Sequence, residues 1–439
     1  MKPAALDLGR PRFLEFNLTV VVKSKPSPLD FQFAADTLAS QWPALALRMN
    51  PLKNKFIEPK MPEDLSDIWQ GRELDRNLGD IIDVPLQGDS PRIFDSEALQ
   101  KSVHFAFGFV ESIKQRVLTI RTVFLRDSCV IGFRFLHPLC DARGAHRIVQ
   151  AYLTLLRGDR LTHTIHSRPS LMLKPEVLKK CVAMTTPREV ATSHHEVSQR
   201  TWPGFLQGFG KQLVRNICHR SSRRVSKTLL VPADQMQRWI RDAEDKGIKV
   251  TEHDLLVAFI YQASLDPTIE QAFGLSLNIA AQLQPDAEFF NPWFTVPITD
   301  YINPTSHIGL TPSLLELAIT IRRTLNEARE PECIAQIIDQ HRSLNDMPTA
   351  PKLQGSRAAQ TLVSSWSEIP LYDLDIQGEN PLFVHGSVDY CGALGETGWK
   401  LDDQVVTWKA KSFGDSDGGY WIHANLPDAV WRRMVQNLG

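Results

Sequence analysis

Hydrophobic positions in the N-terminal part of the chain follow two periodicities in turn. Apolar residues recur at every second position from Arg12 to Lys23, as in a strand with one buried face, and at helical spacing from Leu29 to Gln41. Two more apolar runs, Val117 to Leu125 and Cys129 to Leu136, are separated by three polar residues and predict a hairpin. Helical spacing returns from Ala142 to Arg157, so the pattern predicts alternating strands and helices.

The pattern weakens from about Pro187 to Lys227 and then resumes. In the second half we expect strands at Thr228 to Val231, Leu275 to Leu283, Pro381 to Val388, Val405 to Phe413 and Tyr420 to Asn425, and helices at Ala233 to Asp245, from Thr251, at Pro312 to Ala328, at Pro331 to Arg342 and at Asp428 to Asn437. Because both halves mix strands with helices, the sequence predicts two α/β domains, at residues 1–190 and 228–439, joined by a crossover at 191–227.

Composition narrows the classes of function. The 439 residues are enough for two large hydrophobic cores, and 43% hydrophobic with 23% charged residues excludes a disordered, collagen-like or coiled-coil protein. Lys and Arg number 49 against 50 Asp and Glu, which gives a net charge of -1. Proteins that bind nucleic acid or anionic membranes usually carry a basic excess. We therefore expect a small-molecule enzyme or a neutral binding protein, with no nucleic acid and no membrane as partner.

Cysteine spacing and the N-terminal residues bear on the compartment. The six cysteines are widely spaced and include no CxxC pair, which favours reduced thiols over a disulfide framework. The N-terminal residues lack the apolar core of a signal peptide, and the longest apolar runs are far shorter than the ~20 residues that span a bilayer. The sequence therefore predicts a cytoplasmic protein, which we expect to act as a monomer.

The first candidate for chemistry is the HxxxD segment from His137 to Asp141. It follows an apolar strand and precedes the helix that begins at Ala142, so rigid elements hold it. A neutral imidazole can accept a proton from a hydroxyl or amine near pH 7, whereas the carboxylate can accept hydrogen bonds from the turn or pair with a cation. A purely structural histidine is the alternative. His146 lies nearby, but no cluster of Cys or Glu joins these residues, and we expect no metal site.

The second candidate segment carries Ser364, Ser365 and Trp366, followed by Asp375 and Pro381. Taken with the HxxxD segment, it resembles the BAHD acyltransferase family, including that family's fungal natural-product O-acyltransferases. The family has an HxxxDG motif at the interface of two domains and a later DFGWG motif, which a Thr-Ser-Trp segment introduces. Segments 38–48, 249–259 and 283–291 extend the resemblance along most of the chain.

The resemblance implies a chloramphenicol-acetyltransferase-like fold of two domains, each a mixed sheet with helices, with the active-site channel at their interface. It implies transfer of an acyl group from acyl-CoA to a hydroxyl or amine of a small-molecule natural product, with His137 as the general base. By the same resemblance, the Trp366 indole N–H and the Ser364 hydroxyl stabilise the oxyanion, and Asp141 and Asp375 hold loops in place. Trp366 as an ordinary core residue is the alternative.

Three departures from the family pattern bear on the site. Ala142 stands where the family's HxxxDG motif has Gly after the Asp. The nearest glycine in this sequence is Gly144, two positions later, and we expect it to serve the same structural motif. The DFGWG motif keeps its Asp but loses its aromatics. The family's DxRxR strand reads Asn278 to Gln282 here, so the arginine that pairs with a motif Asp is missing at that place. Arg143 and Arg134 are candidates to substitute for it, and the sequence alone leaves this open.

The sequence therefore does not decide which acyl carrier binds or which reaction takes place. A basic run in the crossover includes Arg215, Arg220, Arg223 and Arg224, which we expect to bind the CoA phosphates unless it is only a solvated face. The altered motifs favour a second hypothesis, in which the same fold performs a CoA-independent cyclisation or condensation. A non-catalytic binding protein is the third hypothesis, and the retained histidine, serine and tryptophan argue against it.

Overall fold

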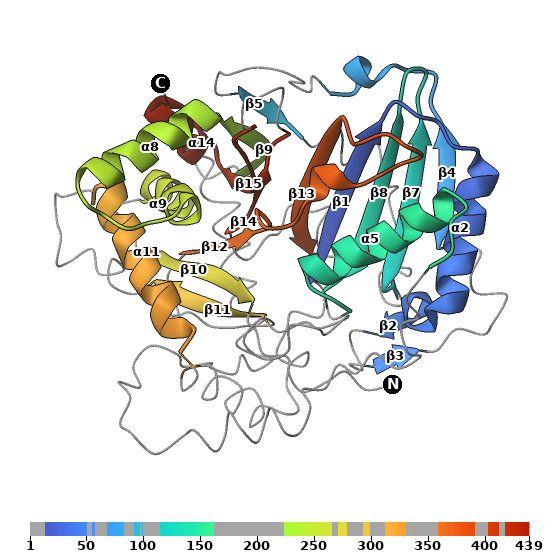
Figure 1. Cartoon of the computed structure of the whole chain (residues 1–439), viewed down its shortest axis with the longest axis horizontal. Coiled ribbons are helices and arrows are strands. Elements are labelled where there is room, and N and C mark those ends of the chain that lie inside the picture. Colours follow the sequence, from blue (N-terminus) through green and yellow to red (C-terminus); the bar gives the residue numbers. More distant parts are fainter. Residues whose placement is uncertain are drawn as a thin grey trace.

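The computed structural model of the chain describes residues 14–50, 55–57, 68–82, 92–96, 99, 115–137, 139–161, 224–265, 271–278, 293–298, 312–330, 333, 359–390, 403–411 and 418–438. Two large sheets stand side by side, each with helices on one side, and they confirm the predicted mixed α/β fold (Figure 1). A small third sheet joins β3 (Lys55–Ile57), β2 (Arg48–Asn50) and β6 (Gln115–Arg116).

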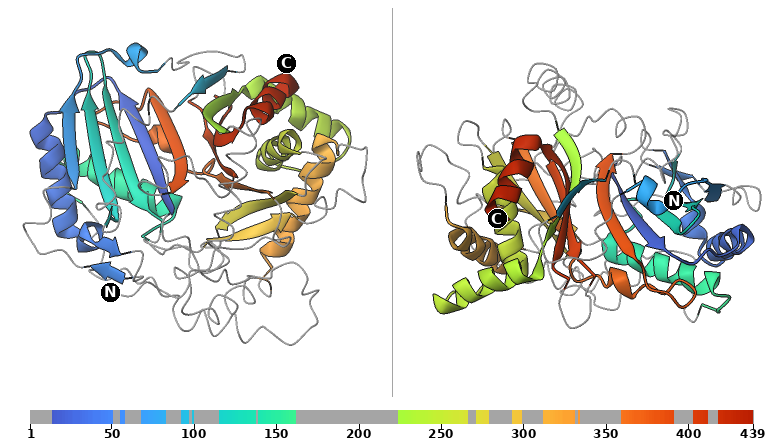
Figure 2. Two further views of the ribbon diagram at one scale, coloured as in Figure 1. Left: turned by 180° about the vertical axis from the view of Figure 1, so that it is seen from behind. Right: turned by 90° about the horizontal axis from the view of Figure 1, so that it is seen from above.

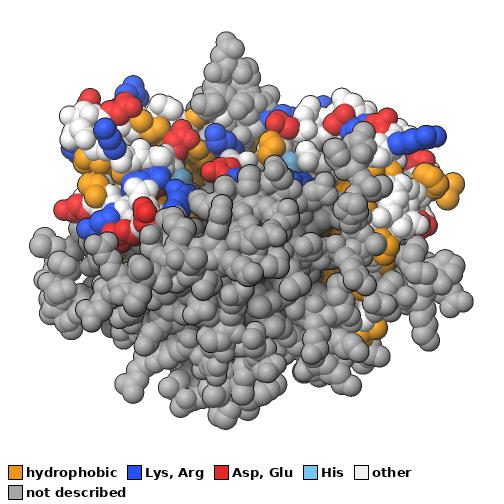
Figure 3. Space-filling model, turned by 60° about the horizontal axis from the view of Figure 1, so that its bottom comes forward, with side chains coloured by type: hydrophobic (Ala, Val, Ile, Leu, Met, Phe, Trp, Pro, Cys, Tyr) orange, Lys and Arg blue, Asp and Glu red, His pale blue; other side chains and the backbone are white. Residues whose placement is uncertain are grey.

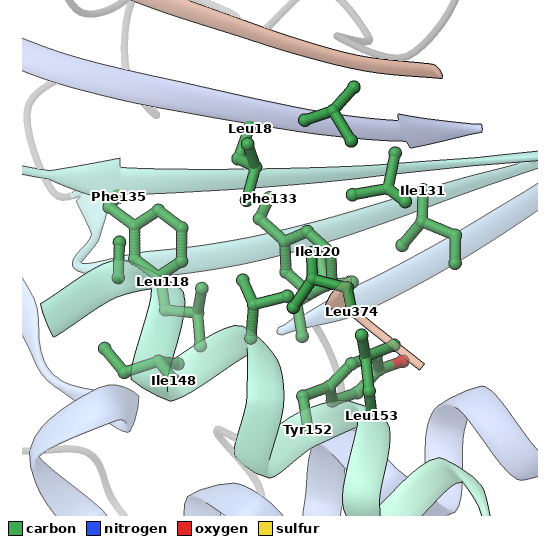
Figure 4. Packing of buried hydrophobic residues seen from close by; sticks show 14 of the residues in the cluster. Leu18, Leu118, Ile120, Ile131, Phe133, Phe135, Ile148, Tyr152, Leu153 and Leu374 are labelled. Atoms are coloured by element: carbon green, nitrogen blue, oxygen red, sulfur yellow. The ribbon is translucent and has the colours of Figure 1, made fainter. Parts of the chain in front are cut away.

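The N-terminal sheet has the strand order β13-β1-β8-β7-β4. Its strands are β13 (Phe383–Tyr390), β1 (Leu14–Val22), β8 (Cys129–Leu136), β7 (Leu118–Phe124) and β4 (Trp69–Glu73). Because β1 pairs with both β13 and β8, the register places Phe16, Phe135 and Val388 on one face. Helices α2 (Pro28–Gln41) and α5 (Ala142–Leu156) lie against this sheet, and Figure 4 shows Phe133 and Phe135 directed toward α5.

Capping and one interhelical hydrogen bond fix the helices that cover this sheet. At the start of α2, the Ser27 side chain accepts a hydrogen bond from the Leu29 N–H at 3.2 Å, and Pro28 takes the first helical position, where an N–H is not needed. The Tyr152 hydroxyl of α5 donates to the Phe31 carbonyl of α2 at 3.1 Å. Burial raises the pKa of Tyr152 well above its usual value, so this hydroxyl stays protonated and remains a donor.

The C-terminal sheet has the strand order β11-β10-β12-β14-β15-β9-β5. Its strands are β11 (Trp293–Ile298), β10 (Gln271–Asn278), β12 (Ala359–Ser365), β14 (Asp403–Lys409), β15 (Tyr420–Pro427), β9 (Arg224–Val231) and β5 (Arg92–Asp95). The accompanying helices are α8 (Ala233–Asp245), α9 (Glu252–Ser264), α11 (Leu314–Ala328) and α14 (Asp428–Leu438). Strands β10, β12 and β14 run parallel, so their carboxyl ends meet at one edge of the sheet.

The two sheets exchange strands across the chain. Strand β13 follows β12 in the sequence yet pairs with β1 in the N-terminal sheet, whereas β5 comes from the N-terminal half and pairs with β9. β13 therefore lies between the two lobes (Figures 1 and 2). The rings of Phe94, Phe383 and Trp421 meet there, with centroids 5.5 to 5.8 Å apart. The predicted domain boundaries at residues 190 and 228 therefore separate two halves of the sequence, but one strand of each half pairs with a strand of the other half.

A buried polar cluster occupies the same junction. His385 Nε2 of β13 lies 3.1 Å from His423 Nδ1 of β15, and the two side chains are 1% and 2% exposed. The hydroxyls of Ser96 and Thr228 lie 3.2 and 3.1 Å from the same Nδ1. Buried polar groups of this kind are retained when they find partners, and here the partners come from both sheets. No sequence pattern indicated this cluster, because its members are far apart in the chain.

The elements that the sequence predicts within the described residues are present, although their ends are shifted: β9 begins at Arg224, four residues before the predicted strand at Thr228. Strands β2, β3, β4, β5, β6, β11 and β12 were not predicted. The predicted helix from Pro331 to Arg342, except for Cys333, lies outside the described residues, as do segments 162–223 and 283–291. On the described surface that Figure 3 shows, acidic and basic side chains are interspersed. Among the helices that the structure describes, none has the length and apolar character needed to cross a membrane.

Burial of His146 in α5 generates a testable pH dependence. The side chain is 7% exposed, and burial lowers its pKa below the usual value, although the Pro370 carbonyl opposes the shift. The native state therefore binds fewer protons at this site than the unfolded chain does. Above about pH 6.5, the pKa of histidine in the unfolded chain, the imidazole is neutral in both states and its burial costs no stability. As the pH falls below this value, the unfolded chain takes up the proton more readily, so the free energy of unfolding decreases.

We expect His146→Gln to reduce the loss of unfolding free energy between about pH 7 and pH 5, because the variant no longer has to bury an imidazole that prefers to be charged. Urea unfolding of the variant and the wild type at both pH values measures the difference. Equal losses in the two proteins would contradict this role for His146.

Candidate active site

A cavity of about 920 Å³ lies between the two halves of the chain. Phe16, His137 and Asp141 line it from the N-terminal half, and residues of α9, α11 and the C-terminal sheet line it from the other side. The carboxyl ends of β10, β12 and β14 reach this cavity, since their end residues Asn278 and Lys409, together with Ser364, contribute to its wall. Ligands commonly bind at the carboxyl ends of parallel strands. The fold therefore brings both sequence motifs to one site.

His137 directly follows β8, half-buried at the cavity wall. The ring of Phe16 in β1 meets its imidazole edge-on, with centroids 5.5 Å apart. The same phenyl ring stacks on Phe135 at 5.1 Å and meets Trp366 edge-on at 6.0 Å. Phe16 thus packs against both the histidine and the tryptophan of the candidate site. The alternating pattern of its strand predicts only that Phe16 is buried, so it was not identified from the sequence as a site residue.

Asp141 closes the turn after His137 as the N-cap of α5. Its side chain is 7% exposed, and Oδ1 accepts a hydrogen bond from the Gly144 N–H at 2.8 Å. A Cβ on Gly144 would come within 2.8 Å of the Cys140 Cβ, closer than real side chains approach. A close contact that requires glycine is therefore present at position 144.

The second oxygen of Asp141 is bound from the other half of the chain. The Asn278 side-chain amide, at the end of β10, donates to Oδ2 at 2.6 Å. Arg134 instead pairs with Glu15 at 2.6 Å, and Arg143 pairs with Glu368. Neither of these arginines is paired with Asp141, so the hypothesis that one of them replaces the missing family arginine is wrong. Asn278, which belongs to the altered strand, donates a hydrogen bond to Asp141 instead.

Ser364 and Trp366 form a hydrogen-bonded pair at the opposite wall. The Trp366 Nε1–H donates to Ser364 Oγ at 3.1 Å, so the serine oxygen accepts and its own proton is available to a further acceptor. The indole is 4% exposed and lies against Gly386 of β13, where a Cβ would come within 2.5 Å of the ring. The structure thus differs from the expectation that both groups donate to the oxyanion, since the indole N–H is directed at the serine.

Asp375 lies away from the cavity, in a tight turn beyond the C-terminal end of α5. Oδ1 accepts from the Gly378 N–H at 2.7 Å, and Arg157 lies 3.3 Å from Oδ2. Gln377 and Gly378 both have positive φ, 54° and 88°, as in a two-residue hairpin turn that favours glycine. The carboxylate therefore joins this turn to the end of the helix that begins after the HxxxD segment.

Basic side chains line the cavity on its C-terminal side. Arg322 binds the buried Asp254 at 2.7 Å, whereas Arg329 and Lys409 are exposed and form no ion pair with any described residue. Arg224 lies elsewhere, in β9, where it donates to the Asn425 carbonyl at 3.3 Å, and Arg223 lies outside the described residues. Within the described ranges, no group of three or more His, Cys, Asp or Glu side chains is placed to hold a metal ion.

Comparisons with known proteins place this geometry in a structural class. No family model and no curated protein matches the sequence. Solved structures do match: TRI101 from F. sporotrichioides, complexed with coenzyme A and T-2, has a TM-score of 0.64 at 13% identity, over 99% of this chain and 96% of that chain. Vinorine synthase has a TM-score of 0.61 at 13% identity, over 98% of this chain and 91% of that chain.

Both proteins are BAHD acyltransferases, so the comparison confirms the two-domain fold that the sequence motifs predict. A condensation domain of the calcium-dependent antibiotic synthetase, solved with a substrate analogue, shares the fold with a TM-score of 0.56 at 10% identity, over 99% of this chain and 92% of that chain. At these identities the likeness establishes the fold, which the three proteins share with this chain.

The contact between Trp366 and Gly386 can be tested by adding a single methyl group. We expect Gly386→Ala to destabilise the protein by about 1–3 kcal/mol, because the methyl has to displace the indole and break its bond to Ser364. Urea unfolding measures the loss. Gly79→Ala is the matched control, since nothing lies within 4 Å of a Cβ there. Equal stability of the two variants would contradict the packing described.

Proposed function

We propose that this chain transfers an acyl group from acyl-CoA to a hydroxyl or amine of a small-molecule natural product. The observation that carries the proposal is the shared cavity, which is lined by His137 from the N-terminal half and by the hydrogen-bonded pair of Ser364 and Trp366 from the C-terminal half. Support for the donor comes from the neighbouring TRI101 structure, which was solved with coenzyme A and the small molecule T-2. We place the reaction in the cytoplasm, in secondary metabolism, and assign it to a monomer.

The proposed reaction needs a base and an oxyanion donor. His137 takes the proton of the acceptor hydroxyl or amine as its oxygen or nitrogen attacks the thioester carbonyl carbon. The Ser364 hydroxyl donates to the resulting oxyanion, and the hydrogen bond that it accepts from Trp366 orients and polarises it. The intermediate then collapses, the carbon–sulfur bond breaks, and the CoA thiolate leaves with the proton held by His137. Trp366 is in this account a positioning residue.

Two observations favour a second activity. The condensation-domain neighbour shares the fold over nearly its whole length, and the arginine strand of the BAHD family is absent from this chain. A CoA-independent condensation or cyclisation would use the same cavity and the same histidine. The two activities differ in the donor, so release of the CoA thiol and binding of CoA distinguish between them.

We expect His137→Ala to lower the turnover number by ~10²–10⁴, the usual contribution of a general base, while the fold is retained. Release of free CoA thiol from acyl-CoA in the presence of candidate alcohols and amines gives the rate, and mass spectrometry identifies the acylated product. His253→Ala is the matched control, because this histidine lines the same cavity from the C-terminal side. Turnover within a few-fold of wild type in folded His137→Ala would sink the assignment.

Two pairs of basic residues are candidates for binding the CoA phosphates, and two double variants distinguish between the candidates. Arg329 and Lys409 line the cavity, so replacing both with Ala should raise the KM for acyl-CoA with little change in kcat, because the contact persists from ground state to transition state. Replacing Arg223 and Arg224 tests the sequence hypothesis in the same assay. A KM that rises only in the second double variant would move the phosphate site to the crossover.

A further inference from the structure

The hydrogen bond between Asn278 and Asp141 joins the two halves of the chain beside the proposed base. Asn278 ends β10 in the C-terminal sheet, and Asp141 opens α5 in the N-terminal half, 137 positions away in the sequence. Nδ2 and Oδ2 are 2.6 Å apart, and the aspartate side chain is 7% exposed. A buried charge-assisted hydrogen bond is strong, and losing one partner leaves the other desolvated and unsatisfied.

The chemistry of the two groups fixes the direction of this bond. An ionised carboxylate only accepts hydrogen bonds, so the nitrogen of the Asn278 amide must face Asp141. The two carboxylate oxygens have separate tasks: Oδ1 binds the Gly144 N–H and holds the start of α5, and Oδ2 binds the amide from β10. The turn that carries His137 is thereby attached at the same residue to its own helix and to the opposite sheet.

We propose that Asn278 is a positioning residue that sets the His137 turn against the C-terminal wall of the cavity. It acts through Asp141 and performs no proton transfer itself. The effect on catalysis rests on the proposed function, whereas the coupling between the two side chains does not. A reacting group displaced by about 1 Å can lose ~10² in rate, so a single amide in this position is enough to govern turnover.

Direct contact with substrate is the competing role, because Asn278 also lines the cavity. Ser276, two residues earlier in the same strand, lines the cavity too and makes no hydrogen bond to Asp141. It therefore provides the matched control. Other ionisable side chains line the cavity: His137 after β8, Arg143 of α5, Glu368 after β12, Glu252 and His253 of α9, Arg322 of α11, Arg329 after α11, Lys409 of β14 and Tyr420 of β15.

The experiment exchanges the two functional groups. Asn278→Asp places a second carboxylate opposite Asp141, and two carboxylates this close cannot both stay ionised. Asp141→Asn keeps a side chain that can cap α5, and the Asn278 amide can rotate to offer its oxygen. In the double variant Asp141→Asn/Asn278→Asp, the donor and the acceptor are exchanged, so the cap and the bond across the site can both form again.

We expect Asn278→Asp to lose about 10² in kcat with little change in either KM. Its melting temperature should fall further below that of wild type at high pH than at low pH, because the proton that the carboxylates share is lost as the pH rises. The double variant should regain most of the turnover and the melting temperature at both pH values. Ser276→Ala should keep the melting temperature of wild type at both pH values, because the Ser276 side chain makes no hydrogen bond to Asp141.

A double variant no better than Asn278→Asp in melting temperature would overturn the inference, whatever the activity. A rise in KM in both Asn278→Asp and the double variant, with kcat retained, would overturn it in favour of substrate contact. Failure of the proposed function is recognised separately: the wild type then releases no CoA thiol, while the melting temperatures of the wild type and the variants still report whether the two side chains are coupled.

Discussion

The crossing of β13 is the constraint on which the arrangement of the two lobes depends. The chain leaves the C-terminal sheet after β12, forms β13, which pairs along its length with β1 of the N-terminal sheet, and then returns to the C-terminal sheet as β14. The Trp408 indole donates to the Val384 carbonyl at 3.1 Å, and the buried contact of His385 with His423 lies beside it. The chain therefore passes between the lobes on both sides of β13, and separating the lobes would break the contacts that Val384 and His385 make with Trp408 and His423 of the C-terminal sheet.

Within that frame, each half contributes what the other lacks. The N-terminal half offers a histidine at the end of an antiparallel strand, and the C-terminal half offers a serine whose oxygen is already bound by an indole. Phe16 packs against both His137 and Trp366, and the bond from Asn278 to Asp141 joins the histidine's turn to the opposite sheet. The proposed chemistry thus depends on contacts between elements that are distant in sequence.

Periodicity and resemblance predicted the parts of this structure that are local. Long elements with one buried face, such as β1 and α5, were recognised, and the motif residues His137 and Ser364 were predicted by resemblance and line the same cavity. Strand β5 was missed because it is short, mostly exposed and lacks alternation. An arginine was considered as the partner of Asp141 because the resembled family pairs its motif aspartate with one. The hydrogen bond from Asn278 depends on how β10 and the start of α5 meet in the fold, which no local sequence pattern encodes.

The central claim is that the cavity holds an acyl-CoA donor, and calorimetric titration of the wild-type protein with CoA tests it most directly. The account predicts saturable binding of one CoA per chain, with an affinity that weakens as salt screens the phosphates. It also predicts that the acyl thioester competes for the same site. Absence of any binding at millimolar CoA would contradict the account and favour the CoA-independent reaction on the same fold.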